Sequence, residues 1–259
     1  MKKYEIKIIK SCYDSNADYH SNDSISASGL KEISKTNPSA YLNKQWQETV
    51  DLAIGTAIHT AILEPEKFSD EIYVMPDLNL RTKAGKEEKE QHIKDAGQKT
   101  VISETNYDLV KKASESFSAN KKAVDLLKES EIEKSYYGQI NGIHVRCRPD
   151  MLGKDFICDL KSCRSIWAND FRQNAKNMRW FLQAVFYSDF LSIPAENFRF
   201  IGVSKDKNPK VEIFGLTEKH IDLGRWQWQE AFDRWFFYKE TGVCPGEYWN
   251  DFDNEIKLI

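Results

Sequence analysis

Residues 148–161 read Arg-Pro-Asp-Met-Leu-Gly-Lys-Asp-Phe-Ile-Cys-Asp-Leu-Lys, which places two acids and a lysine at Asp150, Asp159 and Lys161. The sequence before this stretch predicts a hairpin, because an Asn-Gly pair at 141–142 separates two strand-like runs and suits a turn with two positive φ angles. The residues up to Lys161 form the next predicted strand. Side chains at i and i+2 share one face of a strand, so Asp159 and Lys161 point the same way. Asp150, at the end of the preceding strand, is expected to meet them.

Two carboxylates beside one amine form an arrangement suited to metal-dependent hydrolysis of phosphodiesters. The alternative is a solvated strand face, because Asp-x-Lys is common and a short motif often occurs by chance. The Pro-Asp pair beyond a hairpin favours the catalytic interpretation. The sequence therefore predicts a site for Mg²⁺, with Mn²⁺ as a substitute, bound by Asp150, Asp159 and the backbone carbonyl of Leu160.

A second informative stretch, residues 170–191, contains neither Pro nor Gly and predicts one helix with Asp170 as its N-cap. At about 100° per residue, a polar stripe falls within roughly 80° of arc. It consists of Arg172, Lys176, Arg179, Gln183 and Tyr187. A solvated face is the alternative, but residues 161–180 hold five cations and one acid. We therefore interpret Arg164 and the three cations of the stripe as contacts to phosphate groups.

Together these motifs resemble a known family. The Asp150, Asp159 and Lys161 pattern is similar to the PD-(D/E)xK nuclease signature. Gln183 and Tyr187 resemble the Q-x-x-x-Y element that follows the signature in its RecB-like branch. Gly55-Thr56-Ala57-Ile58-His59 resembles a fourth marker of the RecE-like exonucleases. The four motifs occur in the order found in that family, and the resemblance extends from about Ser24 to the C-terminal helix.

The resemblance implies an α/β fold with a PD-(D/E)xK core, in which helices flank a central mixed β-sheet. We expect one domain over residues 1–259, with residues 1–23 as an N-terminal segment. The resemblance also implies that His59 is a metal ligand, although a buried structural histidine is the alternative. Lys161 would orient or deprotonate the attacking water, and Gln183 and Tyr187 would hold the lysine, the water or the phosphate.

The implied activity is processive 5′→3′ digestion of linear double-stranded DNA, which leaves a 3′ single strand for an annealing protein in recombination. The RecE-like family also implies a ring of subunits, a tetramer or a trimer. The alternatives within the same core are a restriction-type endonuclease and a junction resolvase. A DNA-binding accessory protein with a decayed site is a further alternative, against which the intact Asp150, Asp159, Lys161 and Gln183 argue.

Two further charged segments have open interpretations. Residues 77–100 lack a hydrophobic period and predict a flexible basic loop, in which Arg81, Lys83 and Lys86 would grip DNA; a solvated linker is the alternative. Arg146 and Arg148 share a predicted strand face with Asp150. They either line the cleft or form structural ion pairs.

The bulk properties limit the class of protein. A chain with 41% hydrophobic residues and a net charge of −3 can bury one sizeable core but has no general basic coat. No apolar run approaches the ~20 residues of a membrane span, and the N-terminus lacks a secretory signal, so a cytoplasmic location without membrane contact is predicted. Five scattered cysteines without a C-x-x-C pair argue against a zinc or iron–sulfur site.

The remaining elements are predicted from caps and periodicity. Helices are expected at residues 26–37, from Pro38 onward, and at 51–63, 104–128 and 217–241, and a second hairpin at 198–203 and 211–214. The last helix is rich in aromatic residues that fit either a core or a contact between subunits. A ring would bury Trp226, Trp228, Trp235, Phe236, Tyr248 and Trp249.

Overall fold

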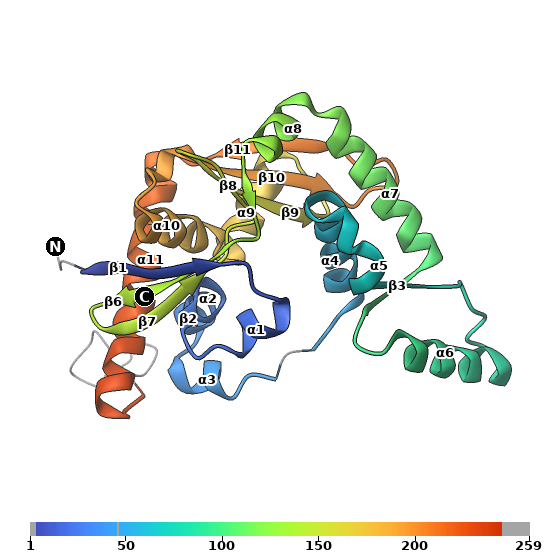
Figure 1. The fold of residues 1–259 in the computed structure, drawn as a ribbon, viewed down its shortest axis with the longest axis horizontal. Coiled ribbons are helices and arrows are strands. Elements are labelled where there is room, and N and C mark those ends of the chain that lie inside the picture. The colour runs from blue at the N-terminus through green and yellow to red at the C-terminus, as the bar shows by residue number, and fades with distance from the viewer. Residues whose placement is uncertain (1–3, 46, 245–259) are drawn as a thin grey trace.

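A five-stranded mixed sheet forms the centre of the computed structural model, which describes residues 4–45 and 47–244 (Figure 1). Its strand order is β11-β10-β9-β8-β5. The strands are β5 (Glu131–Ile132), β8 (Met151–Leu152), β9 (Ile157–Cys163), β10 (Phe198–Ser204) and β11 (Val211–Gly215). β9 and β10 are parallel, whereas β8 and β11 are antiparallel to their neighbours. The expected α/β fold with a central mixed sheet is confirmed.

A second, four-stranded sheet carries the predicted Asn-Gly hairpin. Its order is β1-β6-β7-β2, with β1 (Ile6–Cys12), β2 (Ile25–Ser26), β6 (Ser135–Ile140) and β7 (Ile143–Cys147). Asn141 and Gly142 have φ angles of 48° and 84°, as the turn requires. β1 was not predicted; it pairs antiparallel with β6. A small parallel pair, β3 (Ile72–Met75) and β4 (Thr100–Ser103), completes the strands.

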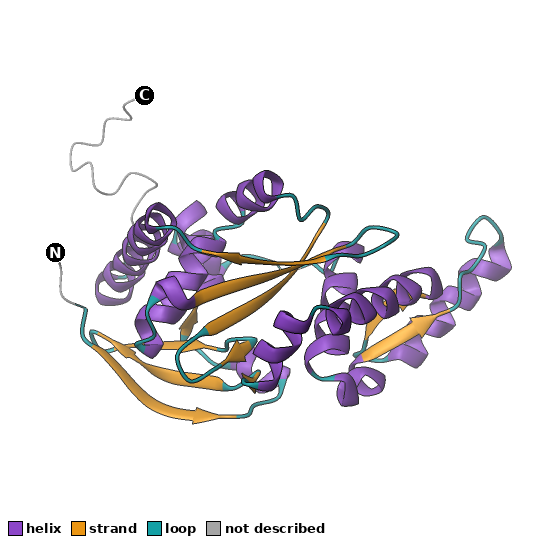
Figure 2. Ribbon diagram, turned by 90° about the horizontal axis from the view of Figure 1, so that it is seen from above, coloured by secondary structure: helices purple, strands orange, loops and turns teal. Residues whose placement is uncertain are grey.

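Helices cover both faces of the five-stranded sheet (Figure 2). One face packs against α2 (Ala27–Lys35), α10 (Trp180–Leu191) and α11 (Glu218–Thr241). The other packs against α4 (Val50–Leu63) and α7 (Glu104–Ala119). β9 alternates between the two cores, since Ile157 belongs to the first and Leu160 to the second. This alternation places Asp159 and Lys161 on the face opposite to Leu160.

The remaining helices are shorter or more exposed. They are α1 (Asn16–Ser21), α3 (Pro38–Leu42), α5 (Phe68–Glu71), α6 (Lys83–Ala96), α8 (Lys121–Lys128) and α9 (Ala168–Asn177), with 3₁₀ turns at Pro65–Lys67 and Ala195–Asn197. The predicted bounds of α2, α4 and α11 are confirmed within two residues, and α3 begins at Pro38 as predicted. Among the described residues, no helix combines the length and the apolarity needed to cross a bilayer.

The prediction of one helix over residues 170–191 is wrong. α9 ends at Asn177, and Arg179 adopts a left-handed conformation with φ 56° before α10 begins. Asp170 lies in the first turn of α9 and does not cap it; the N-cap is Trp167. The break coincides with a change of environment, because α10 is buried around nearly its whole circumference whereas α9 is mostly exposed.

Two further predictions need correction. The helix expected over residues 104–128 is interrupted at Asn120, whose side chain accepts the N–H of Ala123 and so caps α8. The basic loop expected over residues 77–100 is largely helical, because α6 occupies Lys83–Ala96 with Thr82 as its N-cap. α6 lies at one end of the molecule, away from the five-stranded sheet (Figure 1).

The aromatic residues of α11 belong mainly to the core. Trp228 and Trp235 are buried in the cluster with α2 and α10, so the expectation that they are exposed to neighbouring subunits is wrong. Trp226 is 62% exposed. Tyr248 and Trp249 lie outside the described residues. Gly224 allows the close contact of α11 with α10, because a Cβ there would lie 2.3 Å from the carbonyl oxygen of Phe181.

Candidate active site

β9 presents Asp159 and Lys161 on one face, as the alternation of its side chains predicts. Asp159 is completely buried, and one of its carboxylate oxygens, Oδ2, forms an ion pair with the Lys161 ammonium. Leu160 points to the opposite face and is 5% exposed within the second core. Lys161 also lies over the Trp180 ring, with its Nζ 5.6 Å from the ring centroid. The lysine and the carboxylate are therefore held as a unit.

Asp150 connects β9 to α4. It lies between β7 and β8, and its Oδ2 accepts the backbone N–H of Leu160 at 2.6 Å. The same oxygen lies 3.0 Å from His59 Nε2. Burial would raise the pKa of Asp150, but His59, Lys161 and the Leu160 N–H together lower it. By contrast, burial and the nearby Asp150 charge raise the pKa of Asp159 to about 6, although Lys161 opposes this.

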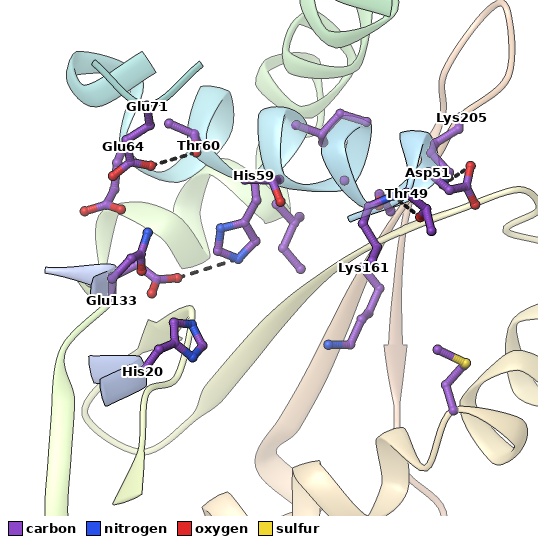
Figure 3. Close-up of a pocket in the computed structure, with 18 residues that line it drawn as sticks. His20, Thr49, Asp51, His59, Thr60, Glu64, Glu71, Glu133, Lys161 and Lys205 are labelled. Carbon is purple, nitrogen blue, oxygen red and sulfur yellow. Dashed lines mark hydrogen bonds and ion pairs between the residues drawn. The ribbon is translucent and has the colours of Figure 1, made fainter. Parts of the chain in front are cut away.

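Glu133, which the sequence analysis did not identify, completes a cluster with His59 and Asp150. One ligand atom from each of the three lies within 4.8 Å of the others. Glu133 Oε1 lies 3.6 Å from His59 Nε2, and the two side chains point toward each other in Figure 3. Glu133 Oε1 is also buried without a hydrogen-bond donor among the described residues. A carboxylate oxygen in this position can ligate a cation.

The backbone of Glu133 supports a functional role for its side chain. Its φ of 51° lies in the left-handed region, which costs a residue other than glycine on the order of 1–3 kcal/mol. The Glu133 N–H donates to the carbonyl of Asp150 at 3.2 Å, and Oε2 lies 4.0 Å from Arg148 Nε. Strained conformations of this kind are concentrated at functional sites. No sequence signal marks this conformation, because Glu131-Ile132-Glu133-Lys134 reads as an ordinary charged segment.

The charge of the cluster suits a divalent cation. Burial alone would lower the pKa of His59, but the charge of Asp150, its hydrogen bond and the charge of Glu133 raise it to about 9. Burial, followed by the charge of Asp150, raises the pKa of Glu133 to about 8, so His59 and Glu133 both retain protons that a bound cation would displace. Imidazole nitrogen with carboxylate oxygens is a donor set that fits Mn²⁺ and accepts Mg²⁺ when further oxygen ligands are added. Asp159 and the Leu160 carbonyl are the neighbouring oxygen donors that the sequence predicts.

Replacement of Glu133 by glutamine is expected to weaken Mn²⁺ binding at least about tenfold, because one anionic oxygen is lost from the cluster. Titration calorimetry with Mn²⁺ measures this change directly. Glu64→Gln is the matched control, since Glu64 lines the same cavity but pairs with Lys67 and lies outside the cluster. Equal Mn²⁺ affinity in Glu133→Gln and wild type would remove Glu133 from the site.

Gln183 joins a second set of polar groups beside the carboxylates. Its amide nitrogen donates to Asp159 Oδ1 at 2.6 Å, and its amide oxygen lies 3.4 Å from Lys161 Nζ. The same oxygen accepts a hydrogen bond from Lys31 Nζ at 2.9 Å. Burial, followed by the Lys161 charge, lowers the pKa of Lys31 to about 7. Lys31 was not predicted, because 152 sequence positions separate it from Gln183.

Tyr187 lies one turn beyond Gln183 on α10 and belongs to the main hydrophobic core. Burial raises its pKa well above the usual value. Within the described part of the chain, Tyr187 forms no hydrogen bond with Asp159, Lys161 or Gln183. The structure therefore brings Gln183 to the predicted site and places Tyr187 beside it in the core.

A cavity of about 710 Å³ opens beside these groups (Figure 3). His59, Glu133, Leu160 and Lys161 line it, together with residues of α1 and Met178. Asp150 and Asp159 are not among its lining residues, but they contact His59 and Lys161, which are. The cavity is therefore large and polar enough to admit a phosphate group to the lysine and the cation site.

Arg146 and Arg148 do not line the cavity, so the cleft interpretation is wrong. Their roles are structural, but hydrogen bonds to neutral groups hold them more than the expected ion pairs. Arg148 Nε donates to Ser135 Oγ at 2.9 Å, and its Nη1 donates to Asn16 Oδ1 at 2.8 Å. Arg146 Nη1 donates to the carbonyl of Ser24 at 2.7 Å. The two guanidinium carbons lie 4.9 and 4.1 Å from the centroid of the Tyr19 ring. They hold the N-terminal segment against β7.

The predicted DNA contacts form two groups. Arg164, Arg172 and Lys176 are exposed on or just before α9, which follows the catalytic strand, whereas Arg179 is half-buried at the helix break. Arg81, Lys83 and Lys86 are exposed at the start of α6, at the other end of the molecule (Figure 1). Lys83 is 3.6 Å from Glu87. The predicted stripe is therefore divided, because Arg172 and Lys176 are exposed on α9 whereas Gln183 and Tyr187 are buried on α10.

Comparisons with known proteins agree with this geometry. Residues 26–247 match the family described as "PDDEXK-like domain of unknown function (DUF3799)". The crystal structure of a "Putative exonuclease" from Eubacterium rectale is similar to this fold with a TM-score of 0.63 and 15% identity, and 96% of each chain is covered. The structure of SSO0001 matches with a TM-score of only 0.28 and 11% identity, over 79% of this chain and 84% of that chain.

No curated protein matches the chain significantly. At 15% identity, the likeness to the Eubacterium rectale protein shows a shared fold. The family match, in contrast, covers most of the chain and includes His59, Glu133, Asp150, Asp159, Lys161 and Gln183. The chain therefore belongs to this PDDEXK-like family, within the PD-(D/E)xK nuclease superfamily.

Proposed function

We propose that this protein is a metal-dependent exodeoxyribonuclease that digests linear double-stranded DNA in the 5′→3′ direction and leaves 3′ single strands for recombination by annealing. One observation carries the proposal: two groups of side chains lie beside the same cavity. They are the cluster of His59, Glu133 and Asp150 and the ion pair of Asp159 and Lys161. The RecE-like motifs favour an exonuclease over an endonuclease or a resolvase. An intact set of carboxylates argues against a decayed site.

The residues of the site have two proposed roles, metal binding and stabilisation of charge on the phosphate. His59, Glu133 and Asp150 would hold Mg²⁺ or Mn²⁺, with Asp159 and the Leu160 carbonyl as adjoining oxygen donors. A cation bound there supplies Lewis acidity toward the phosphate and acidifies a water molecule. Lys161, fixed by Asp159 and Gln183, places a positive charge where the phosphate oxygens gain negative charge.

The proposal is tested with linear duplexes labelled separately at each 5′ and 3′ end. With Mg²⁺ or Mn²⁺, early release of short products from the 5′ label is expected, while the 3′-labelled strand stays long. Ca²⁺ should support binding with little cleavage, because it takes more ligands in looser geometry. Full activity in excess chelator would contradict the proposal. Cleavage of a covalently closed circle at the same rate would favour the endonuclease.

The salt dependence of DNA affinity tests which surface, that of α9 or that of α6, binds DNA. The double variant of Arg172→Gln and Lys176→Gln on α9 is expected to lower the magnitude of the log–log salt slope by about 0.9 for each lost phosphate contact. The double variant of Lys83→Gln and Lys86→Gln on α6 makes the same charge change far from the catalytic strand and should alter the slope less. Fluorescence anisotropy with a labelled duplex measures both. An unchanged slope for the α9 variant would show that this surface is only solvated.

Assembly into a ring around the duplex, a tetramer or a trimer, is part of the proposal, as is an annealing partner. A net charge of −3 supports it, because little basic surface is available to retain DNA through many turnovers. Trp226 on α11 is one exposed residue that a neighbouring subunit could cover. Light scattering that gives a monomer mass, together with long processive digestion, would contradict the ring.

A further inference from the structure

Lys31 is a polar residue of the site that belongs to none of the nuclease motifs. It projects from α2, which packs against α10 and α11, and its ammonium donates to Gln183 Oε1 at 2.9 Å. Burial lowers its pKa, and so does the charge of Lys161 nearby. Holding a second ammonium beside Lys161 costs free energy that an apolar side chain of similar size would avoid. A function in the site accounts for its presence better than packing does.

The contacts of Gln183 define the orientation of its amide. The amide NH₂ faces Asp159 Oδ1, and the amide oxygen faces the ammonium groups of Lys31 and Lys161. The reversed amide would place its hydrogens against two cations and its oxygen against a carboxylate, which is unfavourable at both ends. Lys31 and Asp159 therefore fix the orientation of the Gln183 amide. As a result, Lys161 faces the amide oxygen and not the amide nitrogen.

Lys31 and Lys161 share the same amide oxygen unequally. The distance from Oε1 is 2.9 Å to Lys31 Nζ but 3.4 Å to Lys161 Nζ. Because Lys31 supplies the stronger donor, Gln183 restrains Lys161 from one side without capturing it. The Lys161 ammonium then remains between Asp159 and the cavity, where a phosphate can reach it.

We propose that Lys31 is a positioning residue, which acts through Gln183 to hold the Lys161 ammonium in place for phosphodiester hydrolysis. This inference rests on the proposed nuclease function. Without Lys31, the Gln183 oxygen has Lys161 as its remaining ammonium donor, so Lys161 moves toward the amide and away from the cavity. The loss should appear in the rate of the chemical step and leave DNA affinity nearly unchanged.

A double-mutant cycle of Lys31→Met and Gln183→Met tests the coupling, because methionine keeps the approximate length of both side chains. Single-turnover cleavage is measured with enzyme in excess and saturating Mg²⁺, and duplex affinity is measured in Ca²⁺. We expect Lys31→Met to slow cleavage at least about tenfold, or ~1.4 kcal/mol. Added to Gln183→Met, it should cause less than about a twofold further loss.

Lys35→Met is the matched control, since it removes a lysine one turn further along α2, at an exposed position. It should leave the single-turnover rate unchanged. Lys31→Arg keeps a charged donor and should recover part of the rate. If Lys31→Met does not fold, as judged by thermal unfolding, the cycle is run with Lys31→Leu, which also removes the ammonium donor and should show the same coupling.

Independent, additive losses in the cycle would overturn the inference, because Lys31 would then act on DNA or on the fold by another route. An unchanged rate in Lys31→Met would overturn it as well. These outcomes are distinguishable from failure of the proposed function. In that case the wild-type protein itself would not cleave linear duplex with Mg²⁺, whereas the inference alone fails when wild type cleaves and the cycle is additive.

Discussion

Replacement of Asp150 by asparagine is expected to abolish cleavage of linear duplex DNA, with a loss of at least about a thousandfold, or ~4 kcal/mol of transition-state stabilisation. The Asp150 carboxylate oxygen Oδ2 lies 3.0 Å from His59 Nε2 and accepts the Leu160 N–H at 2.6 Å. It therefore joins His59 on α4 to β9, the strand that carries Asp159 and Lys161. Asparagine keeps the shape and the hydrogen bond to Leu160 but removes the charge that a cation or His59 requires.

The measurement is the single-turnover rate of Asp150→Asn at saturating Mg²⁺, with thermal unfolding to verify the fold. Asp155→Asn is the matched control, because Asp155 is an exposed aspartate just before β9, on the same stretch of chain. It should cleave at the wild-type rate. Retention of more than about a tenth of wild-type activity by Asp150→Asn would exclude Asp150 from the metal site.

Replacement of Lys161 by methionine is expected to slow the chemical step about 100- to 1,000-fold, the range found when one preorganised electrostatic donor is removed. Lys161 forms its ion pair with Asp159 and lines the cavity, so its charge can meet the phosphate directly. His59, Glu133 and Asp150 do not depend on it for their mutual contacts. Metal binding should therefore persist in the variant.

Stopped-flow cleavage and Mn²⁺ titration together separate these effects. Lys205→Met is the matched control, because Lys205 is a second lysine that lines the cavity but pairs with Asp51 at 3.0 Å. Its rate should fall much less. A loss of activity in Lys161→Met that disappears at high DNA concentration would show that Lys161 only binds substrate.

The parts of the site that were predictable depend on local geometry. The period of two along β9 places Asp159 and Lys161 on one face. The Asn-Gly hairpin defines the preceding strand, and Asp150 follows the end of that strand. These signals involve residues close together in the chain, so they can be read from a single sequence without knowledge of the tertiary contacts. His59 was found through its resemblance to a family motif, and the structure brings it within 3.0 Å of Asp150.

The parts that were not predictable depend on the packed chain. Glu133 reaches the site because its backbone is left-handed, and no residue type in this segment predicts that conformation. Lys31 meets Gln183 across 152 positions and reads in sequence as an ordinary surface lysine of a short helix. The continuous helix through Arg179 followed from a local pattern, which did not reveal the left-handed backbone of Arg179.

The contacts of the Tyr19 ring with Arg146 and Arg148 have a consequence for where the folded unit begins. The family match starts at residue 26, yet α1 supplies Asn16 and His20 to the cavity wall and Asn16 also accepts a hydrogen bond from Arg148. A fragment cut at the family boundary would lose that wall and leave two buried guanidinium groups without their aromatic and amide partners. The unit that builds the candidate site is therefore larger than the range that matches the family.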